Sequence, residues 1–221
     1  PGIEFIGIYA HESGSVPTDE GVARVALEVG AIMSELARML RRAGIAIDHV
    51  SVGASPTFTA TCHYIKEGVL KDITEIHAGA RIIGDIRSMM MHSHTREQCV
   101  ATILTTVVST SHPNHAIIDA GMKAFGTDPL MQYQNSPGFL WNGKPSFGSI
   151  QGRSNLWLGR LAAESGWLYY INADKKLYLG ERLEIVPNNS TQVLNIHDKA
   201  YGVRNGRIEK EFSIAGRGRG S

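Results

Sequence analysis

A long amphipathic helix is predicted early in the chain, between two short apolar runs. Thr18 is a suitable N-cap, acidic residues follow in the first turn, and apolar residues recur at helical spacing up to two arginines and a stop at Gly44. The apolar runs, residues 3–9 and 47–52, have the composition of strands buried on both faces of a parallel sheet. The order strand, helix, strand constrains the fold most, because parallel strands need a crossover of this kind.

The pattern continues with a short helix near residues 62–70 and a strand at residues 73–76. The first part of the chain is therefore predicted to be α/β with parallel strands. Polar residues follow the carboxyl ends of all three strands, where such sheets bind ligands. They are Tyr9 and His11, then residues 53–57, and then residues 77–79.

The stretch from Val50 to Phe58 is a candidate phosphate-binding turn. Gly53 and Ala54 would let backbone N–H groups approach an anion closely, and Ser55 and Thr57 would add hydroxyl donors. As a motif it is short, and an ordinary turn is the alternative interpretation.

After Asp85 the sequence becomes rich in β-branched and aromatic residues, which predicts a mainly antiparallel β domain. We therefore expect two domains, residues 1–85 and 86–221. The predicted strands lie within residues 100–109, 116–119, 157, 167–171, 176–179, 183–186 and 193–196, with turns at Asn142-Gly143, Ala173-Asp174 and Asn205-Gly206.

Composition excludes several functional classes. The formal net charge is +1, so no overall field favours nucleic acid, and the Gly-Arg tail is too short to change that. No apolar run is long enough for a membrane span, and the first residues lack the order of a signal peptide. Two cysteines far apart indicate neither a disulfide framework nor a thiolate cluster, so we expect a reducing, cytoplasmic location.

A series of short motifs then identifies a family. They are Ile8-Tyr9-Ala10-His11, residues 50–57, residues 74–79 with Asp85, residues 105–109, residues 119–124, Val186-Pro187-Asn188, residues 195–198 and residues 215–218. In their order and spacing these motifs resemble the D-threonine aldolase/D-serine dehydratase family of pyridoxal-phosphate enzymes. The resemblance implies the C-terminal part of a (β/α)8 barrel followed by a mainly antiparallel β domain, as in the alanine-racemase-like fold.

The resemblance also implies a site. Tyr9 and His11 would be catalytic, and pyridoxal 5'-phosphate would be bound by Tyr9, Gly53, Ala54, Ser55, Thr57 and Gly79. For Tyr9 there is a plainer alternative, simple packing at a strand end. Glu75 and Asp85 would orient neighbouring groups or act as caps. Asp119 and Lys123 would either reach a partner's site in a dimer or form salt bridges on a turn.

The chain departs from the family at the Schiff-base lysine. In the family this lysine lies on an early barrel strand, and Lys66, Lys71 and Lys123 do not match that position, so we interpret them as surface lysines. The residues up to Asp85 supply only about three of the eight βα units of a closed barrel. We therefore expect a complementary N-terminal barrel segment, or a separate chain, to carry the lysine.

The chain also departs from the family at its metal ligands. The family has a His, and two residues later a Cys or Asp, where this chain has Asn189 and Thr191. An amide and a hydroxyl are poor ligands for zinc or manganese, so we expect no tight divalent metal. His92, His94 and Cys99, and also the pair His112 and His115, are interpreted as loop residues rather than ligands, the histidines being solvated.

The function that the resemblance implies is a pyridoxal-phosphate-dependent lyase acting on a β-hydroxy D-amino acid, by aldol cleavage or dehydration. Its partners would be a small amino-acid substrate and a second subunit, in a homodimer or heteromer, with neither nucleic acid nor membrane. The alternative is a non-catalytic or regulatory subunit, a degenerate relative that keeps the fold and the dimer surface.

Overall fold

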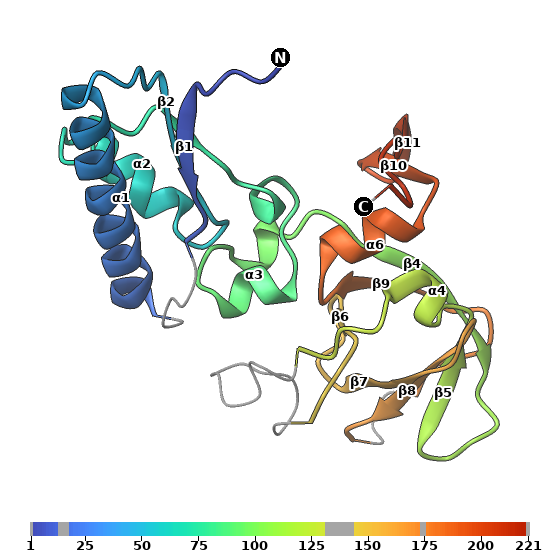
Figure 1. Ribbon diagram of the computed structural model, residues 1–221. Coiled ribbons are helices and arrows are strands. Elements are labelled where there is room, and N and C mark those ends of the chain that lie inside the picture. Colours follow the sequence, from blue (N-terminus) through green and yellow to red (C-terminus); the bar gives the residue numbers. More distant parts are fainter. Residues whose placement is uncertain (1, 13–17, 131–143, 173–175, 220–221) are drawn as a thin grey trace. The chain divides into compact units, whose positions relative to one another are not determined.

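The structure is a computed structural model that describes residues 2–12, 18–130, 144–172 and 176–219. The chain forms two compact units (Figure 1). The first comprises Pro1–Ile82 and Ser88–Gln98, and the second comprises Ile83–Arg87 and Cys99–Ser221. The domain boundary expected after Asp85 stays a prediction.

The first unit is built on a three-stranded parallel sheet in the order β1-β2-β3. The strands are β1 (Gly7–Ala10), β2 (His49–Val52) and β3 (Glu75–Ile76), and they are connected by helices α1 (Asp19–Arg42) and α2 (Phe58–Lys66). Figure 1 shows both helices on the same side of β1 and β2. The βαβαβ pattern predicted from the sequence is confirmed.

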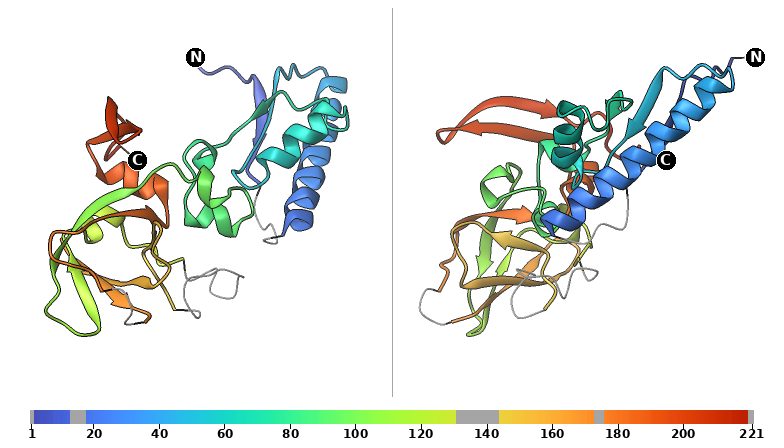
Figure 2. Two further views of the ribbon diagram at one scale, coloured as in Figure 1. Left: turned by 180° about the vertical axis from the view of Figure 1, so that it is seen from behind. Right: turned by 90° about the vertical axis from the view of Figure 1, so that its left-hand side faces the viewer.

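Helix α1 begins and ends where its capping residues predict. The Gly21 N–H donates to the Thr18 hydroxyl over 3.0 Å, and the chain leaves the helix through Ala43 into Gly44, whose φ is 82°. Figure 2 shows α1 as one unbroken helix. No helix among the described residues is long and apolar enough to cross a membrane.

The core of the first unit lies between the sheet and these helices. Val50 and Val52 of β2 are fully buried and pack with Met33 and Ala37 of α1. The start of the chain behaves differently, because β1 is an edge strand: Ile3 is 99% exposed and Phe5 is 59% exposed. Burial of the first strand on both faces stays a prediction, because it requires a neighbour beside β1 that the described residues do not supply.

Three short helices follow β3. They are η1 (Ala80–Ile82), α3 (Ile86–Met90) and η2 (Arg96–Gln98). The second unit contains a six-stranded sheet in the order β6-β9-β4-β5-β8-β7, with every neighbouring pair antiparallel. Its strands are β4 (Ile103–Ser109), β5 (His115–Ile118), β6 (Gly148–Ile150), β7 (Leu156–Leu161), β8 (Gly166–Tyr170) and β9 (Arg182–Pro187).

The six-stranded sheet is nearly closed. The Phe147 N–H, just before β6, donates to the Leu158 carbonyl of β7 over 3.0 Å, which brings the two edge strands together. Inside it, Val107, Ile118 and Ile185 belong to one buried apolar cluster with residues of β6, β7 and β8. The expected antiparallel β domain is confirmed.

Two predicted strands of this unit are wrong. Residues 176–179 form no strand, and residues 193–196 belong to helix α6 (Ser190–Ile196). A helix forms here despite the β-branched residues, and Asn189 caps it: the Asn189 side chain accepts a hydrogen bond from the Gln192 N–H. A further short helix, α4 (Met122–Phe125), follows β5.

The unit ends in a separate two-stranded ribbon, β10 (Lys199–Arg204) and β11 (Arg207–Ser213). Both views of Figure 2 show the ribbon standing apart from the six-stranded sheet. Asn205 and Gly206 connect its strands with φ of 51° and 73°, so this predicted turn is confirmed. The turns predicted at 142–143 and 173–174 lie outside the described residues.

Candidate functional site

The register of the parallel sheet brings the predicted site residues to one edge. Tyr9 pairs with Ser51, and Ser51 pairs with Glu75, so the carboxyl ends of β1, β2 and β3 lie side by side. His11, residues 53–57 and residues 77–79 all follow directly from these ends. The predicted convergence is therefore present within the first unit.

Gly53 allows the turn to pass close to the next strand. A Cβ atom at Gly53 would lie 2.3 Å from the carbonyl oxygen and 2.5 Å from the nitrogen of His77, so only glycine fits. The His77 N–H in turn donates to the Val52 carbonyl over 2.9 Å. Gly79 has no such constraint, because a Cβ there would meet no described residue within 4 Å.

The turn after Gly53 binds a carboxylate of the chain itself. Glu12 is 4% exposed, and its Oε2 accepts a hydrogen bond from the Thr57 hydroxyl. The backbone of Ala54 also hydrogen-bonds this carboxyl group, and the Thr61 hydroxyl lies 3.5 Å from its Oε1. Two of the residues that the sequence assigned to a phosphate, Ala54 and Thr57, thus hydrogen-bond the carboxyl group of Glu12.

Burial raises the pKa of Glu12 above its ordinary value of 4.5. The hydrogen bonds from Thr57, Ala54 and Thr61 act in the opposite direction, as does the charge of His11, but burial is the largest influence. Glu12 is therefore a titratable group whose protonation is favoured by its place on the turn.

Tyr9 and His11 are both exposed at this edge. The Tyr9 hydroxyl lies 3.3 Å from His11 Nδ1, and the Tyr9 ring lies 5.1 Å from the ring of His77, tilted by 56°. The three side chains form one aromatic group beside the turn. Imidazole is the side chain suited to proton transfer near neutral pH, so the group has the chemistry for acid-base work.

Sequence reasoning missed Glu12 at this edge and two polar residues of β2, His49 and Ser51. Glu12 received no role, and neither did His49, whose Nδ1 lies 2.7 Å from Glu75 Oε1. The Ser51 hydroxyl is buried and has no hydrogen-bond partner within the described part of the chain. One signal could have found the last two: residues 49, 51 and 75 alternate with apolar positions in β2 and β3, which places them on the face away from the helices.

The second unit contains the positions of the family's metal ligands. The Thr191 hydroxyl donates to Asn189 Oδ1 over 2.7 Å, and Asn189 Nδ2 donates to Asp128 over 3.3 Å. The side chains of Asn189 and Thr191 are therefore hydrogen-bonded to each other, and Asn189 caps α6. Among the described residues, no group of three or more His, Cys, Asp or Glu side chains could hold a metal ion.

Asp85 has a structural position in the same unit. It is 1% exposed, and its Oδ2 accepts from the Ser190 N–H over 2.9 Å and from the Ser190 hydroxyl over 3.0 Å. Of the two roles considered, capping is the one that this geometry shows. Glu75, by contrast, pairs with His49 on the surface of the first unit.

We expected the histidines of both pairs to be solvated loop residues, but not all of them are. His94 is only 9% exposed. Its Nε2 donates to the Arg81 carbonyl over 2.9 Å, and its Nδ1 lies 3.0 Å from the Ser93 hydroxyl. His92 is exposed and pairs with Asp19 over 3.3 Å. Cys99 is buried, and its thiol donates to the Asp85 carbonyl. These residues do not form a chelating group.

His115 also differs from the expectation. It lies half-buried on β5. Its ring stacks on that of His112 at 4.4 Å and lies 5.4 Å from the tilted ring of Tyr169. Burial lowers the pKa of His115, and the neighbouring His112 lowers it further. His112 itself is exposed, as predicted.

The lysines lie on the surface, as predicted. Lys66, Lys71 and Lys123 are exposed, and Lys123 Nζ lies 2.6 Å from Glu164 Oε1. Asp119 accepts from the Thr105 hydroxyl over 2.6 Å and from the Thr106 N–H over 2.8 Å. Burial raises the pKa of Asp119, but these hydrogen bonds together outweigh it, so the pKa lies below its ordinary value.

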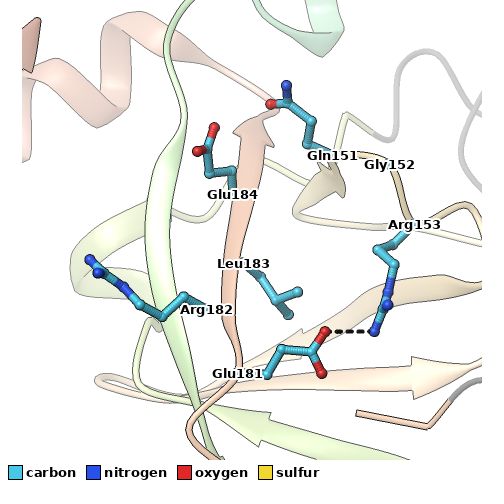
Figure 3. A pocket seen from close by; sticks show the side chains of 7 residues that line it. All are labelled: Gln151, Gly152, Arg153, Glu181, Arg182, Leu183 and Glu184. Carbon is cyan, nitrogen blue, oxygen red and sulfur yellow. Dashed lines mark hydrogen bonds and ion pairs between the residues drawn. The ribbon is translucent and has the colours of Figure 1, made fainter. Parts of the chain in front are cut away.

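A shallow pocket lies elsewhere, in the second unit. Figure 3 shows its lining, residues 151–153 and 181–184. Two of its charges neutralise each other, because Arg153 pairs with Glu181 over 2.8 Å. A third, Glu184, lies 3.4 Å from the Thr102 hydroxyl. No predicted site residue lines this pocket.

The comparisons with known proteins identify the class. Residues 101–203 match the family model of the putative serine dehydratase domain. That part of the chain is therefore a serine dehydratase-like domain, and the family resemblance seen in the sequence motifs is confirmed.

Particular relatives agree with this class. The chain is 29% identical to the D-threonine aldolase of Arthrobacter sp. over 225 residues, which cover 99% of this chain and 53% of the relative. The solved D-threo-3-hydroxyaspartate dehydratase from Delftia sp. HT23 matches with a TM-score of 0.82 at 24% identity, over 96% of this chain and 56% of that one. An alanine racemase-like protein from Idiomarina loihiensis matches with a TM-score of 0.78 at 21% identity, over 97% and 57%. The expected alanine-racemase-like fold is confirmed.

The chain spans about half the length of the curated relatives it matches. These relatives are aldolases and dehydratases. The expectation of pyridoxal phosphate was based on a resemblance to such enzymes, so it is confirmed at the level of the family. The reaction, substrate and partners of the whole protein are proposals.

Proposed function

We propose that this chain is part of a pyridoxal-phosphate-dependent lyase that acts on a β-hydroxy D-amino acid, by aldol cleavage or dehydration. The observation that carries the proposal is the turn between β2 and α2. Its backbone at Ala54 and its Thr57 hydroxyl already hydrogen-bond the carboxyl group of Glu12, so these groups fit the phosphate of the cofactor. When bound, pyridoxal phosphate supplies the electron sink for such reactions.

The roles of the chain's own residues follow from their positions. Ala54, Ser55 and Thr57 would bind the phosphate, with Gly53 and Gly79 keeping the backbone open at the ends of β2 and β3. Tyr9 would contact the cofactor or substrate, and His11, 3.3 Å from the Tyr9 hydroxyl, would hold or move a proton. The lysine that binds the cofactor would come from an N-terminal barrel segment or a second chain, in a homodimer or heteromer.

The exposed start of the chain supports such a complement. Ile3, Phe5 and Ile6 are all about half exposed or more, next to the open edge of β1. An apolar edge strand of this kind needs a neighbour in a soluble protein. A segment that adds strands beside β1 would both cover these residues and extend the sheet.

The test is to locate the lysine chemically. Native protein is purified with the cofactor, its visible absorbance is recorded, and the bound cofactor is fixed by borohydride reduction before peptide mass spectrometry. We expect a visible band and a modified lysine in a peptide outside these 221 residues. Native material that stays colourless after loading, or a modified Lys66, Lys71 or Lys123, would contradict the proposal. If the visible band and the modified lysine are found, D-threonine and D-serine are the first substrates to test.

A non-catalytic subunit is the second candidate. Asn189 and Thr191 replace the family's metal ligands and bind each other, which favours a relative that has lost part of its chemistry. Colourless native protein that retains phosphate binding at the turn would support this candidate.

A further inference from the structure

The interaction of Glu12 with the turn has consequences for whatever binds there. The Glu12 carboxyl group uses the Ala54 backbone and the Thr57 hydroxyl, which are the donors that the proposed function assigns to phosphate. Two occupants cannot share these donors. A phosphate group can bind only after Glu12 has left the turn.

The hydrogen-bond geometry accommodates a proton on Glu12 while it occupies the turn. The Thr57 hydroxyl has one proton but two oxygen neighbours, Glu12 Oε2 and the Ala54 carbonyl at 3.0 Å. The Thr61 hydroxyl likewise has the Thr57 carbonyl at 3.0 Å and Glu12 Oε1 at 3.5 Å. If Glu12 is protonated, its O–H donates to Thr57, and both threonines are free to donate to the two carbonyls.

We propose that Glu12 is a displaceable internal ligand of the phosphate turn, which binds it as a carboxylic acid and is released as a carboxylate when an oxyanion takes its place. Glu12 thereby sets the affinity of the turn and couples anion binding to the release of a proton. This inference rests on the proposed phosphate site, but it concerns the turn and not the reaction.

The charged surroundings make the sign of the pH dependence diagnostic. Among the described residues, His11 is the titratable group whose charge acts on Glu12. Protonated His11 attracts an anion, so it strengthens anion binding as the pH falls. Displacement of protonated Glu12 has the opposite effect on anion binding. A lower pH stabilises the turn with Glu12 bound to it, so anion binding weakens as the pH falls. Comparing Glu12 variants that all retain His11 isolates the contribution of Glu12.

The experiment uses sulfate, whose charge is constant over the pH range, with native protein from which the cofactor has been removed. Calorimetric titrations in buffers of different ionisation enthalpy give both the affinity and the number of protons released. We expect Glu12→Ala to bind sulfate about tenfold more tightly or better, without the proton release of the wild type. Glu12→Gln, a neutral side chain of the same shape, should stay on the turn and bind sulfate no more tightly than the wild type.

Glu67→Ala is the matched control, since Glu67 lies exposed at the other end of α2 and pairs with His63. It should leave the affinity unchanged. Equal affinity in the wild type and Glu12→Ala would overturn the inference, as would tight binding by Glu12→Gln, which would indicate simple charge repulsion. The absence of sulfate binding in every variant would overturn it too. None of these readouts depends on catalysis, so a failure here is distinct from a failure of the proposed lyase function.

If Glu12→Ala does not fold, carboxyl-carbon NMR of the wild type gives the same answer. The Glu12 signal should titrate above its ordinary pKa without sulfate and return toward the ordinary pKa when sulfate is added. If the pKa of the Glu12 signal does not change when sulfate is added, the inference is overturned.

Discussion

The Glu12 carboxyl group is hydrogen-bonded to the hydroxyl of Thr57, a residue 45 positions further along the chain. This contact ties the loop after β1 to the turn after β2, across the carboxyl edge of the parallel sheet. It places a buried acid on the donors of the candidate phosphate site, and it gives that site an internal competitor.

Gly53→Ala should destabilise the first unit, because the added Cβ would meet the backbone of His77 at 2.3 Å. We expect a loss of about 1–3 kcal/mol in the free energy of unfolding, the usual cost of overpacking. Gly79→Ala is the control, since its Cβ would meet no described residue within 4 Å. Urea titrations measure both, and equal stability of the two variants would contradict the close approach.

Glu12 should make stability depend on pH. Its pKa is raised in the folded state, so its contribution is fully present below the ordinary value of 4.5 and is lost as the pH rises through the folded-state pKa. Glu12→Gln should therefore gain stability relative to the wild type as the pH rises above that range. Thermal unfolding at a series of pH values tests this, with Glu67→Gln as a control that follows the wild type. A constant difference between wild type and Glu12→Gln would refute it.

Asp85→Asn should weaken the start of α6. Its carboxylate accepts both the N–H and the hydroxyl of Ser190 in a buried position, and an amide cannot accept both at the same oxygen as strongly. We expect a loss of about 1–3 kcal/mol in unfolding free energy. Glu209→Asn, on the exposed ribbon, should stay close to the wild type. Similar denaturation midpoints for Asp85→Asn and the wild type would show that the cap is unimportant.

Elemental analysis of the purified protein should find zinc and manganese at less than stoichiometric levels. The amide and hydroxyl of Asn189 and Thr191 are weak ligands and are already hydrogen-bonded to each other. The double variant Asn189→His with Thr191→Cys should raise the metal content. A tightly bound ion in the wild type that disappears when Asn189 and Thr191 are changed to alanine would show the opposite.

Residues Pro1 to Ser221 expressed alone should bind a hydrophobic dye or aggregate. The exposed side chains of Ile3, Phe5 and Ile6 beside the open edge of β1 are the reason. Light scattering and dye fluorescence provide the measurement, and Phe5→Ser with Ile6→Ser should reduce both signals. An isolated chain that is monomeric, cooperatively folded and active with added cofactor would disprove the need for a complement.

Local patterns in the sequence determined much of the fold. The cap at Thr18, the helical spacing up to Gly44 and the Asn205-Gly206 hairpin were predictable because each depends on neighbouring residues. The convergence of Tyr9, Gly53 and His77 on one edge also followed from the strand order alone, because parallel strands share their carboxyl end.

Tertiary structure decided the rest. The strand predicted at residues 193–196 became part of α6, whose first residue, Ser190, donates through its N–H and its hydroxyl to the distant Asp85. The burial of His94 depends on contacts with Arg81, and the position of Glu12 depends on Thr57 and Thr61. No local pattern encodes such contacts, because they form only when distant segments pack together and a buried polar group must find a partner.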